Sequence, residues 1–294
     1  PYMTEPTEGL ATAGDGPAPP AEASVAGPWR NYPPEPAHGE HTVVGELQIL
    51  EGLYSPELDN RRNVITYLPP SYGDGTRRYP VIYMHDGQNL FDEVTSFAEE
   101  WGVDNTMEVL SLVGLEAIVV GVFNAGEHRL DEYSPFEDAE GRGGKGDRYL
   151  DFLVDTLKPR IDRDFRTRPE RDHTAIVGSS MGGLISLYAF FRRPDVFGKA
   201  GVMSPSLWFA DRAIFPFVEE AAFNPGKVYL DVGTLEGERT VADTRRLREL
   251  LLRKAYRRHR DLVYVEQPGA GHSETAWRQR LHFAIDFLLR EVHR

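Results

Sequence analysis

The residues best suited to chemistry form the run 178–182, Gly-Ser-Ser-Met-Gly, which fits the pattern Gly-x-Ser-x-Gly. An apolar stretch predicted as a strand over His173–Gly178 precedes the run, and a helical pattern follows it. A serine on a sharp turn between a strand and a helix exposes its hydroxyl above the sheet, and only small neighbours fit around such a turn. The run therefore predicts Ser180 as a nucleophile, while Ser179 stands at the wrong position of the pattern.

A serine hydroxyl is a weak nucleophile at neutral pH, so Ser180 needs a histidine to accept its proton and a carboxylate to orient that histidine. His272 lies in a loop of small residues that follows a predicted strand and precedes the last predicted helix. This position makes it the predicted base. Three other histidines also follow the serine, but they lie in a basic run or in and beyond the last helix, where structural or solvent-facing roles are predicted: His259, His282 and His293.

The third member of the triad is expected just after the predicted strand Val228–Gly233. Glu236 is the predicted acid, because it lies past the end of that strand. Asp231 is the second choice, since a carboxylate inside a buried strand is more often structural, and Glu238 is the third. The resulting chain order of serine, acid and histidine is the order that α/β-hydrolases use.

Acyl transfer also needs two hydrogen-bond donors that stabilise the negative oxygen of the tetrahedral intermediate. The backbone amide of Met181 is the first prediction, and the backbone amide of Gln88, in the loop after an earlier apolar strand, is the second. His85 and Asp86 precede the serine and are expected to shape this loop. The histidines show no His-Glu-x-x-His spacing, so no metal site is predicted.

Short apolar segments that alternate with helical patterns must position these residues. The expected strands are Thr42–Leu50, Asn63–Leu68, Pro80–His85, Ala117–Phe123, His173–Gly178, Ala200–Met203, Val228–Gly233 and Leu262–Glu266. The first two suggest an antiparallel entry, and the nearly continuous apolar runs among the others indicate a parallel sheet buried on both faces. The predicted fold class is α/β, an α/β-hydrolase fold with a doubly wound, mostly parallel sheet and helices on both faces.

Apolar stripes mark the faces of helices that cover this sheet. The stripe members are Leu153, Leu157, Ile161 and Phe165, then Leu247 and Leu251, and finally Trp277, Leu281, Ile285 and Leu289. Residues 1–38 are rich in Pro, Gly and Ala, a composition that predicts a flexible tail, or alternatively a lid or a dimer arm that docks through Trp29 and Tyr32. Residues 39–294 are predicted to form a single catalytic domain.

Composition excludes several classes of function. The formal charge of −13, from 46 acidic and 33 basic residues, disfavours nucleic acid and anionic membranes as partners. The absence of cysteine excludes disulfides, thiolate metal sites and a cysteine nucleophile. No secretory pattern opens the sequence, which predicts a cytoplasmic protein. No cofactor is expected, and oligomeric state is not predictable from these residues.

With these motifs in hand, the sequence resembles the esterase family of the α/β-hydrolase superfamily that includes esterase D, feruloyl, acetylxylan and enterochelin esterases and mycolyltransferases. The resemblance covers residues 40–292 and rests on the segments Tyr83–Gln88, Val120–Asn124, Arg129–Tyr133, Gly178–Gly182, Gly233–Glu236 and Gly271–His272. It implies ester hydrolysis through an acyl-enzyme, with Ser180, Glu236 and His272 in the matching positions. Where feruloyl-type members often carry aspartate, this chain has Glu236.

The predicted function is that of a serine carboxylic-ester hydrolase without cofactor, acting on a small-molecule or carbohydrate ester such as an acylated sugar, a feruloyl-type ester or a siderophore ester. An acyltransferase with the same triad, or a non-catalytic binding protein of this fold, is the alternative. Substrate contacts are predicted for Arg129, Trp208 and Phe91. Arg129 also forms an arginine–glutamate pattern with Glu132, for which a structural ion pair is equally expected.

Overall fold

The computed structural model describes residues 27–33 and 40–291. The strands are β1 Arg30–Tyr32, β2 Glu46–Ser55, β3 Asn60–Leu68, β4 Val81–His85, β5 Ile118–Val122, β6 Thr174–Ser179, β7 Lys199–Met203, β8 Lys227–Gly233 and β9 Leu262–Gln267. The α-helices are α1 Val103–Ser111, α2 Arg129–Glu132, α3 Gly146–Asp151, α4 Lys158–Asp164, α5 Met181–Arg192, α6 Phe209–Arg212, α7 Ile214–Glu220, α8 Glu238–Arg253 and α9 Glu274–Leu289.

The strands form one sheet in the order β1-β2-β3-β5-β4-β6-β7-β8-β9. The pairs β1–β2, β2–β3 and β3–β5 are antiparallel, and from β5 to β9 all neighbours are parallel. This confirms the antiparallel entry and the mostly parallel sheet. Each predicted strand is present, and the largest shift is that of β2, which starts at Glu46 and not at Thr42. The predicted α/β-hydrolase fold is confirmed.

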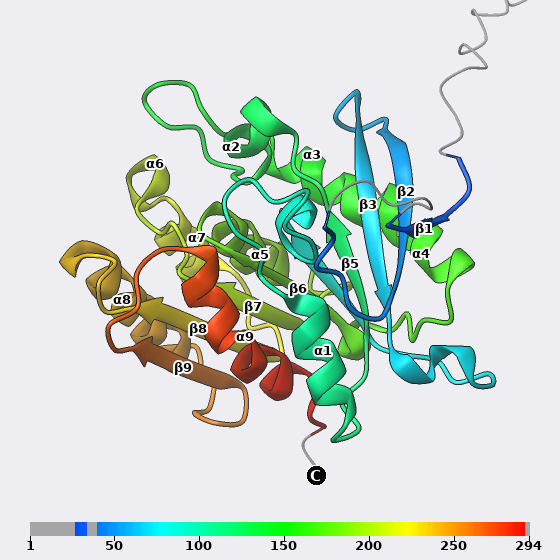
Figure 1. Ribbon diagram of the computed structural model, residues 1–294. Helices are drawn as coiled ribbons and strands as arrows, with labels where there is room; N and C mark the ends of the chain where they lie inside the picture. The colour runs from blue at the N-terminus through cyan, green and yellow to red at the C-terminus, as the bar shows by residue number, and fades with distance from the viewer. Residues whose placement is uncertain (1–26, 34–39, 292–294) are drawn as a thin grey trace, which may run out of the picture.

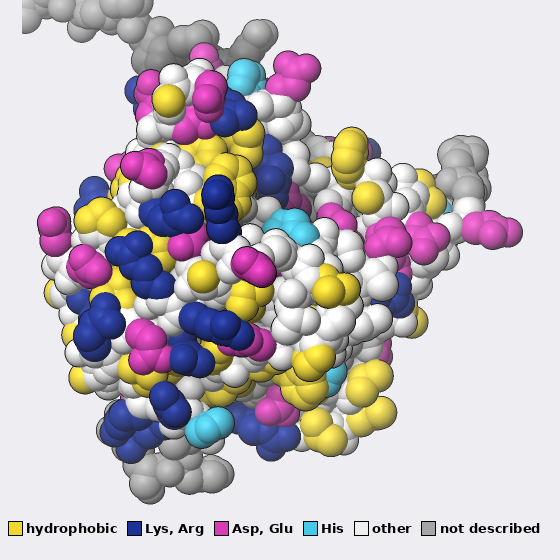
Figure 2. Space-filling model, turned by 90° about the vertical axis from the view of Figure 1, so that its left-hand side faces the viewer, with side chains coloured by type: hydrophobic (Ala, Val, Ile, Leu, Met, Phe, Trp, Pro, Cys, Tyr) yellow, Lys and Arg dark blue, Asp and Glu magenta, His cyan; other side chains and the backbone are white. Residues whose placement is uncertain are grey.

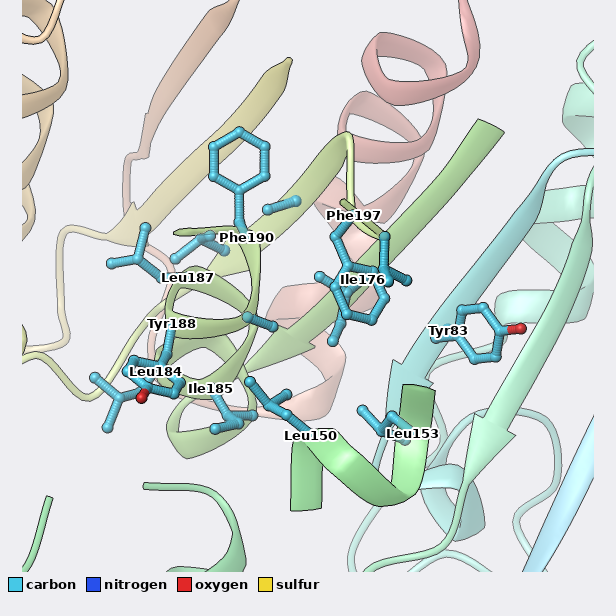
Figure 3. Packing of buried hydrophobic residues seen from close by; sticks show 14 of the residues in the cluster. Tyr83, Leu150, Leu153, Ile176, Leu184, Ile185, Leu187, Tyr188, Phe190 and Phe197 are labelled. Atoms are coloured by element: carbon cyan, nitrogen blue, oxygen red, sulfur yellow. The ribbon is translucent and has the colours of Figure 1, made fainter. Parts of the chain in front are cut away.

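Helices cover both faces of the sheet (Figure 1). On β4, Val81 and Tyr83 belong to the core shared with α3, α4, α5, α7 and α8, whereas Ile82 and Met84 belong to the core shared with α1 and α9. The alternation follows from the strand geometry, because successive side chains point to opposite faces. Figure 3 shows part of the first core at close range, with Leu184 and Leu187 of α5 and Ile176 of β6 among the labelled side chains.

The predicted helical stripe Leu153, Leu157, Ile161 and Phe165 is confirmed as buried. A π-helical turn, Phe152–Leu157, joins α3 to α4. It ends immediately before Lys158, which is followed by Pro159. Proline has no amide hydrogen to donate, and its ring would clash with the carbonyl of the preceding turn in a regular α-helix. The wider π-helical turn before Pro159 is compatible with the missing amide hydrogen and with the space that the proline ring needs.

Most of the segment predicted as a tail, residues 1–38, lies outside the described residues, as does His293. Its described part, residues 27–33, contains β1. Trp29 donates a hydrogen bond from Nε1 to Asp164 Oδ2 at 2.9 Å, and the Tyr32 hydroxyl donates to Asp92 Oδ2 at 2.7 Å. Both aromatic side chains therefore contact the folded body, and a role of this segment as a lid or a dimer arm stays a prediction.

Basic and acidic side chains lie close together on the face that carries α8 and β9 (Figure 2). Arg245 of α8 pairs with Glu266 of β9 at 2.6 Å, and Arg212 pairs with Asp243 at 2.9 Å. Solvent screens the exposed arginines of these pairs, so the pairs contribute little to stability. Within residues 27–33 and 40–291, no helix has the length and apolarity needed to cross a membrane.

Candidate active site

Ser180 occupies the sharp turn between β6 and α5. Its backbone has φ 58° and ψ −122°, a strained conformation for a residue with a side chain. The turn is held on both sides, because the Ser180 amide donates to Met203 O at 3.1 Å and the Ser206 amide donates to Ser180 O at 3.0 Å. The predicted nucleophile position is therefore built into the sheet and the helix that follows it.

Two glycines make this turn possible by close packing. A Cβ on Gly178 would lie 2.7 Å from His85 Cδ2, and a Cβ on Gly183 would lie 2.8 Å from Met203 O. At Gly182, which was expected to supply room, the nearest atom would be His85 Cβ at 3.3 Å. Gly183 is thus more tightly enclosed than Gly182, although it lies outside the Gly-x-Ser-x-Gly pattern.

The predicted base and acid lie together at the carboxyl ends of β8 and β9. His272 Nδ1 is 2.8 Å from Glu236 Oε2, and the side chains are 41% and 1% exposed. Trp277 packs edge-on against the His272 ring, with the ring centroids 5.0 Å apart. One edge of the imidazole is therefore held by a buried carboxylate, while the other remains open to solvent.

The Glu236 carboxylate is held from several sides. Its Oε1 accepts hydrogen bonds from the Ser204 hydroxyl at 2.6 Å and the Gly233 amide at 2.7 Å. Burial opposes ionisation of this group, but the hydrogen bonds from His272, Ser204 and Gly233 outweigh burial, so the pKa of Glu236 lies below its ordinary value. Glu236 is therefore an ionised acceptor at neutral pH.

The two other candidates for the triad acid, Asp231 and Glu238, have different surroundings from Glu236. Asp231 is fully buried in β8 and accepts from Arg280 Nε at 2.8 Å and from the Ser204 amide at 2.9 Å. Glu238 is exposed at the start of α8. Among the described residues, neither carboxylate forms a hydrogen bond with His272, so the geometry favours Glu236 for this position.

The hydroxyl of Ser180 contacts a second serine. Ser180 Oγ is 3.1 Å from Ser206 Oγ, and no hydrogen bond joins Ser180 to His272 among the residues that the structure describes. Catalytic hydrogen bonds are often long in unliganded enzymes and tighten only with substrate. Ser180 and His272 nevertheless line the same cleft.

Both predicted amide donors lie at the first positions of helices. Met181 opens α5, and Gln88 lies in the single-turn 3-10 helix Gly87–Asn89. Amides at the start of a helix have no partner within the helix. The Gln88 loop is fixed by its own hydrogen bonds, since Gln88 Oε1 accepts from the Asn124 amide at 3.2 Å and Gln88 O accepts from Thr95 Oγ1 at 2.7 Å.

Arg129 supports this loop through Asp86. The guanidinium donates to both Asp86 carboxylate oxygens, at 2.7 and 2.8 Å, and Asn124 Nδ2 donates to the same carboxylate at 2.7 Å. Burial opposes ionisation of Asp86, but Arg129 and Asn124 lower its pKa. The prediction that Asp86 shapes the loop fits this arrangement. Glu132 pairs with Arg62 at 2.9 Å and not with Arg129, so the expected ion pair has different partners.

Ser180 and His272 line a cleft of about 480 Å³. Its lining residues are Asp86, Gln88, Asn89, Phe97, Ala98, Trp101, Asn124, Arg129, Ser179, Ser180, His272, Glu274 and Trp277. Arg129 thus lines this cleft, and its contact with a substrate stays a prediction. Among the described residues, no group of three or more histidine, aspartate or glutamate side chains is arranged to hold a metal ion.

Two predicted substrate contacts need correction. Phe91 is 1% exposed and packs in the core shared by α1 and α9, because the loop after β4 turns its side chain inward. Trp208 lines a different cavity, together with Ala210 and Asp211. Sequence reasoning missed Phe97, which is 93% exposed and lines the cleft.

Comparison with known proteins identifies the family. A family model described as "Putative esterase" matches residues 55–288. The ferri-bacillibactin esterase BesA of Bacillus subtilis is 28% identical over 245 residues, which cover 75% of this chain and 82% of that protein. An endo-1,4-beta-xylanase/feruloyl esterase of Xylanibacter ruminicola is 31% identical over 147 residues, which cover 47% of this chain and 19% of that protein.

Among solved structures, the BES protein from Bacillus cereus superposes with a TM-score of 0.68 at 22% identity, over 87% of this chain and 99% of that chain. This likeness supports the fold that the sheet order shows. The family model spans most of the chain and carries the functional assignment. The chain therefore belongs to the esterase family of the α/β-hydrolase superfamily and is a carboxylic ester hydrolase.

Proposed function

We propose that the chain is a serine esterase in which Ser180 forms an acyl-enzyme, His272 transfers the protons and Glu236 orients His272. The observation that carries the proposal is the 2.8 Å contact between His272 Nδ1 and Glu236 Oε2, in the cleft that the strained Ser180 turn also lines. The three groups come from three separate loops at the carboxyl edge of one sheet, which is where this fold places its ligands.

The proton transfers follow from the Glu236 contact. Because the ionised carboxylate accepts from Nδ1–H, the Nε2 atom of His272 carries a lone pair and can accept a proton. The Ser180 hydroxyl turns from Ser206 to His272 Nε2, loses its proton and attacks the ester carbonyl carbon. The resulting imidazolium protonates the leaving alcohol, and water then releases the acid by the same steps.

The backbone amides of Met181 and Gln88 are proposed to stabilise the tetrahedral oxyanion. Each is a donor at the start of a helix, and the Met181 amide adjoins the nucleophile itself. Loss of one such donor typically raises the barrier by about 3–4 kcal/mol. The tight hydrogen bonding of the Gln88 loop would hold its amide in place before the substrate binds.

The lining of the cleft supports an ester of an aromatic acid as the substrate. Phe97, Trp101 and Trp277 supply aromatic surface beside the catalytic residues. An aromatic side chain as exposed as Phe97 gains little from folding, and contact with an aromatic acyl group would remove it from water. A relative named as a feruloyl esterase fits this class.

Charge in the cleft favours an uncharged acyl group. Arg129 is neutralised by Asp86, and Glu274 has no ion-pair partner among the described residues. A multiply anionic substrate would meet the Glu274 carboxylate without a free arginine to balance it. Within the predicted substrates, a neutral feruloyl-type or iron-free siderophore ester therefore fits better than an anionic iron complex.

Steady-state hydrolysis tests this proposal. Methyl ferulate, an acetylated sugar, and a catechol siderophore ester with and without iron would be compared by kcat/KM for the wild type, Ser180→Ala and Ser179→Ala. We expect the highest value for a neutral aromatic ester, with loss of activity in Ser180→Ala and folded, active protein in Ser179→Ala. Activity that survives in Ser180→Ala would contradict the proposed nucleophile, and a preference for the acetylated sugar or for the iron complex would contradict the proposed substrate.

A further inference from the structure

A buried polar cluster lies directly behind Glu236. Arg280 of α9 is completely buried, and its Nε donates to Asp231 Oδ2 at 2.8 Å. Its Nη2 donates to Ser204 Oγ at 2.6 Å and lies 3.4 Å from Glu236 Oε1. Trp277 donates from Nε1 to the same Ser204 oxygen at 2.9 Å. Burying an arginine and two carboxylates is costly unless every group is paired, and here each is paired.

The donors and acceptors of this cluster fix the direction of the Ser204 hydroxyl. Arginine and tryptophan side chains have donors and no acceptor, so the Ser204 oxygen must accept from both Arg280 and Trp277. A hydroxyl has one hydrogen and two lone pairs, and both lone pairs are then occupied. The single Ser204 hydrogen has one remaining partner, Glu236 Oε1, at 2.6 Å.

This direction determines the protonation of the next two groups. Glu236 Oε1 receives donors from Ser204, from Arg280 and from the Gly233 amide, so that oxygen has no room for a proton of its own. Three donors on one oxygen stabilise the ionised carboxylate over the acid, so Oε2, which lies 2.8 Å from His272 Nδ1, acts as an acceptor. The contact is therefore Nδ1–H donating to Oε2, which leaves the lone pair on Nε2.

We propose that Arg280 and Ser204 are positioning residues that fix the tautomer of His272 through Glu236, and that the buried Asp231 serves to hold Arg280. The inference rests on the proposed function, in which His272 is the base. It also gives Asp231 a role that explains its burial without making it a member of the triad.

Charge accounting supports this division of roles. Burial raises the pKa of Asp231, whereas Arg280 and the Ser204 amide favour its ionised form. With both carboxylates ionised, Arg280, Asp231 and Glu236 carry one net negative charge, which a protonated His272 would balance during the reaction. Without Arg280, two buried carboxylates would face each other across Ser204, and one of them would take up a proton. Arg280 therefore allows Glu236 to remain an acceptor while Asp231 neutralises the arginine from the other side.

The first test variant replaces both Arg280 and Asp231, so that no unpaired charge stays buried. In Arg280→Met/Asp231→Leu, Ser204 loses its strongest donor, and we expect kcat to fall about 10- to 100-fold, the range known for residues that orient metal-bound histidines from behind. The acid limb of the pH profile should move to higher pH, because Glu236 loses its cationic neighbour. Arg280→Lys keeps the charge but not the two-pronged geometry, so it should keep the acid limb while kcat falls.

Two further variants separate positioning from stability. Ser204→Ala removes only the hydroxyl and should lower kcat with KM within about threefold, so it replaces the double variant if that one does not fold. Arg62→Met/Glu132→Leu removes another buried pair, whose side chains are each 1% exposed, and should retain kcat whatever its effect on stability. If the Arg280 and Ser204 variants fold and keep the wild-type kcat and pH profile, the inference is overturned.

A spectroscopic measurement keeps this inference distinct from the proposed function. The proton between His272 Nδ1 and Glu236 can be followed as a downfield resonance in the proton NMR spectrum, whether or not the protein hydrolyses a given ester. We expect the resonance in the wild type and its loss or upfield shift in Ser204→Ala. An unchanged resonance in that variant overturns the inference, whereas a wild type that shows the resonance but hydrolyses no ester counts against the proposed function.

Discussion

Replacement of Glu236 by glutamine would test the triad at the level of a single proton. The side-chain oxygen of the glutamine must take the place of Oε1, because that place receives the Gly233 amide at 2.7 Å and the Ser204 hydroxyl at 2.6 Å. The amide nitrogen then faces His272 Nδ1 and donates to it. The proton of His272 is thereby moved to Nε2, the atom that has to accept from Ser180.

The size of the effect follows from the cost of the opposite orientation. A flipped glutamine would set its N–H groups against the Gly233 amide and Arg280, and each unsatisfied buried donor costs roughly 1–3 kcal/mol. Two such donors cost about 2–6 kcal/mol, which lowers the population of the productive tautomer by about 30- to 10⁴-fold at 1.4 kcal/mol per tenfold. With the charge beside the imidazolium also lost, we expect kcat to fall by about 10⁴, as for the comparable change in serine proteases.

The assay is steady-state hydrolysis of p-nitrophenyl acetate at neutral pH, with thermal unfolding to confirm that the variant is folded. Glu238→Gln is the matched control, because this exposed glutamate lies two residues away and outside the cleft. It should keep kcat within about twofold. A folded Glu236→Gln variant that retains more than about a tenth of the wild-type kcat would refute the reasoning.

Three other predictions concern the surroundings of the site. Gly178→Ala should lower the free energy of unfolding in urea by about 1–3 kcal/mol, because its Cβ would lie 2.7 Å from His85 Cδ2. Burial lowers the pKa of His85 to about 3 from 6.5, so as pH falls below 6.5 only the unfolded chain binds this proton. The free energy of unfolding should then decrease by up to about 1.4 kcal/mol per pH unit, a slope that His85→Gln reduces. Phe97→Ala should raise KM for esters of aromatic acids several-fold.

Each of these predictions has a control. Gly73→Ala should leave stability nearly unchanged, since nothing lies within 4 Å of its Cβ position, and an equal loss at Gly73 and Gly178 would exclude packing as the cause. His282→Gln, on an exposed position, should keep the pH slope. Trp208→Ala lies outside the cleft and should leave KM unchanged, whereas a rise in KM for Trp208→Ala alone would restore the original expectation for that residue.

The turn at Ser180 was predictable because its chemistry is local. An apolar strand, two glycines around a serine and a helical pattern occur within one short stretch, and each is required by the sharp turn. His272 and Glu236 could be proposed from their places after strands, since the carboxyl ends of parallel strands meet at one edge of the sheet. Their mutual contact could be expected from this rule, but not its distance.

The residues behind Glu236 were not predictable in the same way. Ser204 and Arg280 meet only because α9 packs against β7 and β8, a contact between segments far apart in the chain. One local signal existed, because Arg280 falls among the buried positions of the stripe that includes Trp277 and Leu281. An arginine inside an apolar stripe calls for a buried carboxylate partner, and Asp231 is that partner.

Aromatic residues illustrate a second limit. Phe91 and Phe97 both follow β4 in the same loop, yet Phe91 is buried and Phe97 is exposed at the cleft. Hydrophobicity alone does not separate a core contact from a substrate contact. The strand β1 was missed for a similar reason, since its three residues lie in a proline-rich segment and pair with β2 only through tertiary contacts.

Labelling with a fluorophosphonate probe tests the central claim most directly. The probe reacts with an activated serine, and intact mass followed by peptide mapping locates the adduct. We predict a single adduct on the peptide that contains Ser180, suppressed by substrate and absent in Ser180→Ala. An adduct on another serine such as Ser206, or ester hydrolysis by a protein that the probe does not label, would contradict the assignment of Ser180 as the nucleophile.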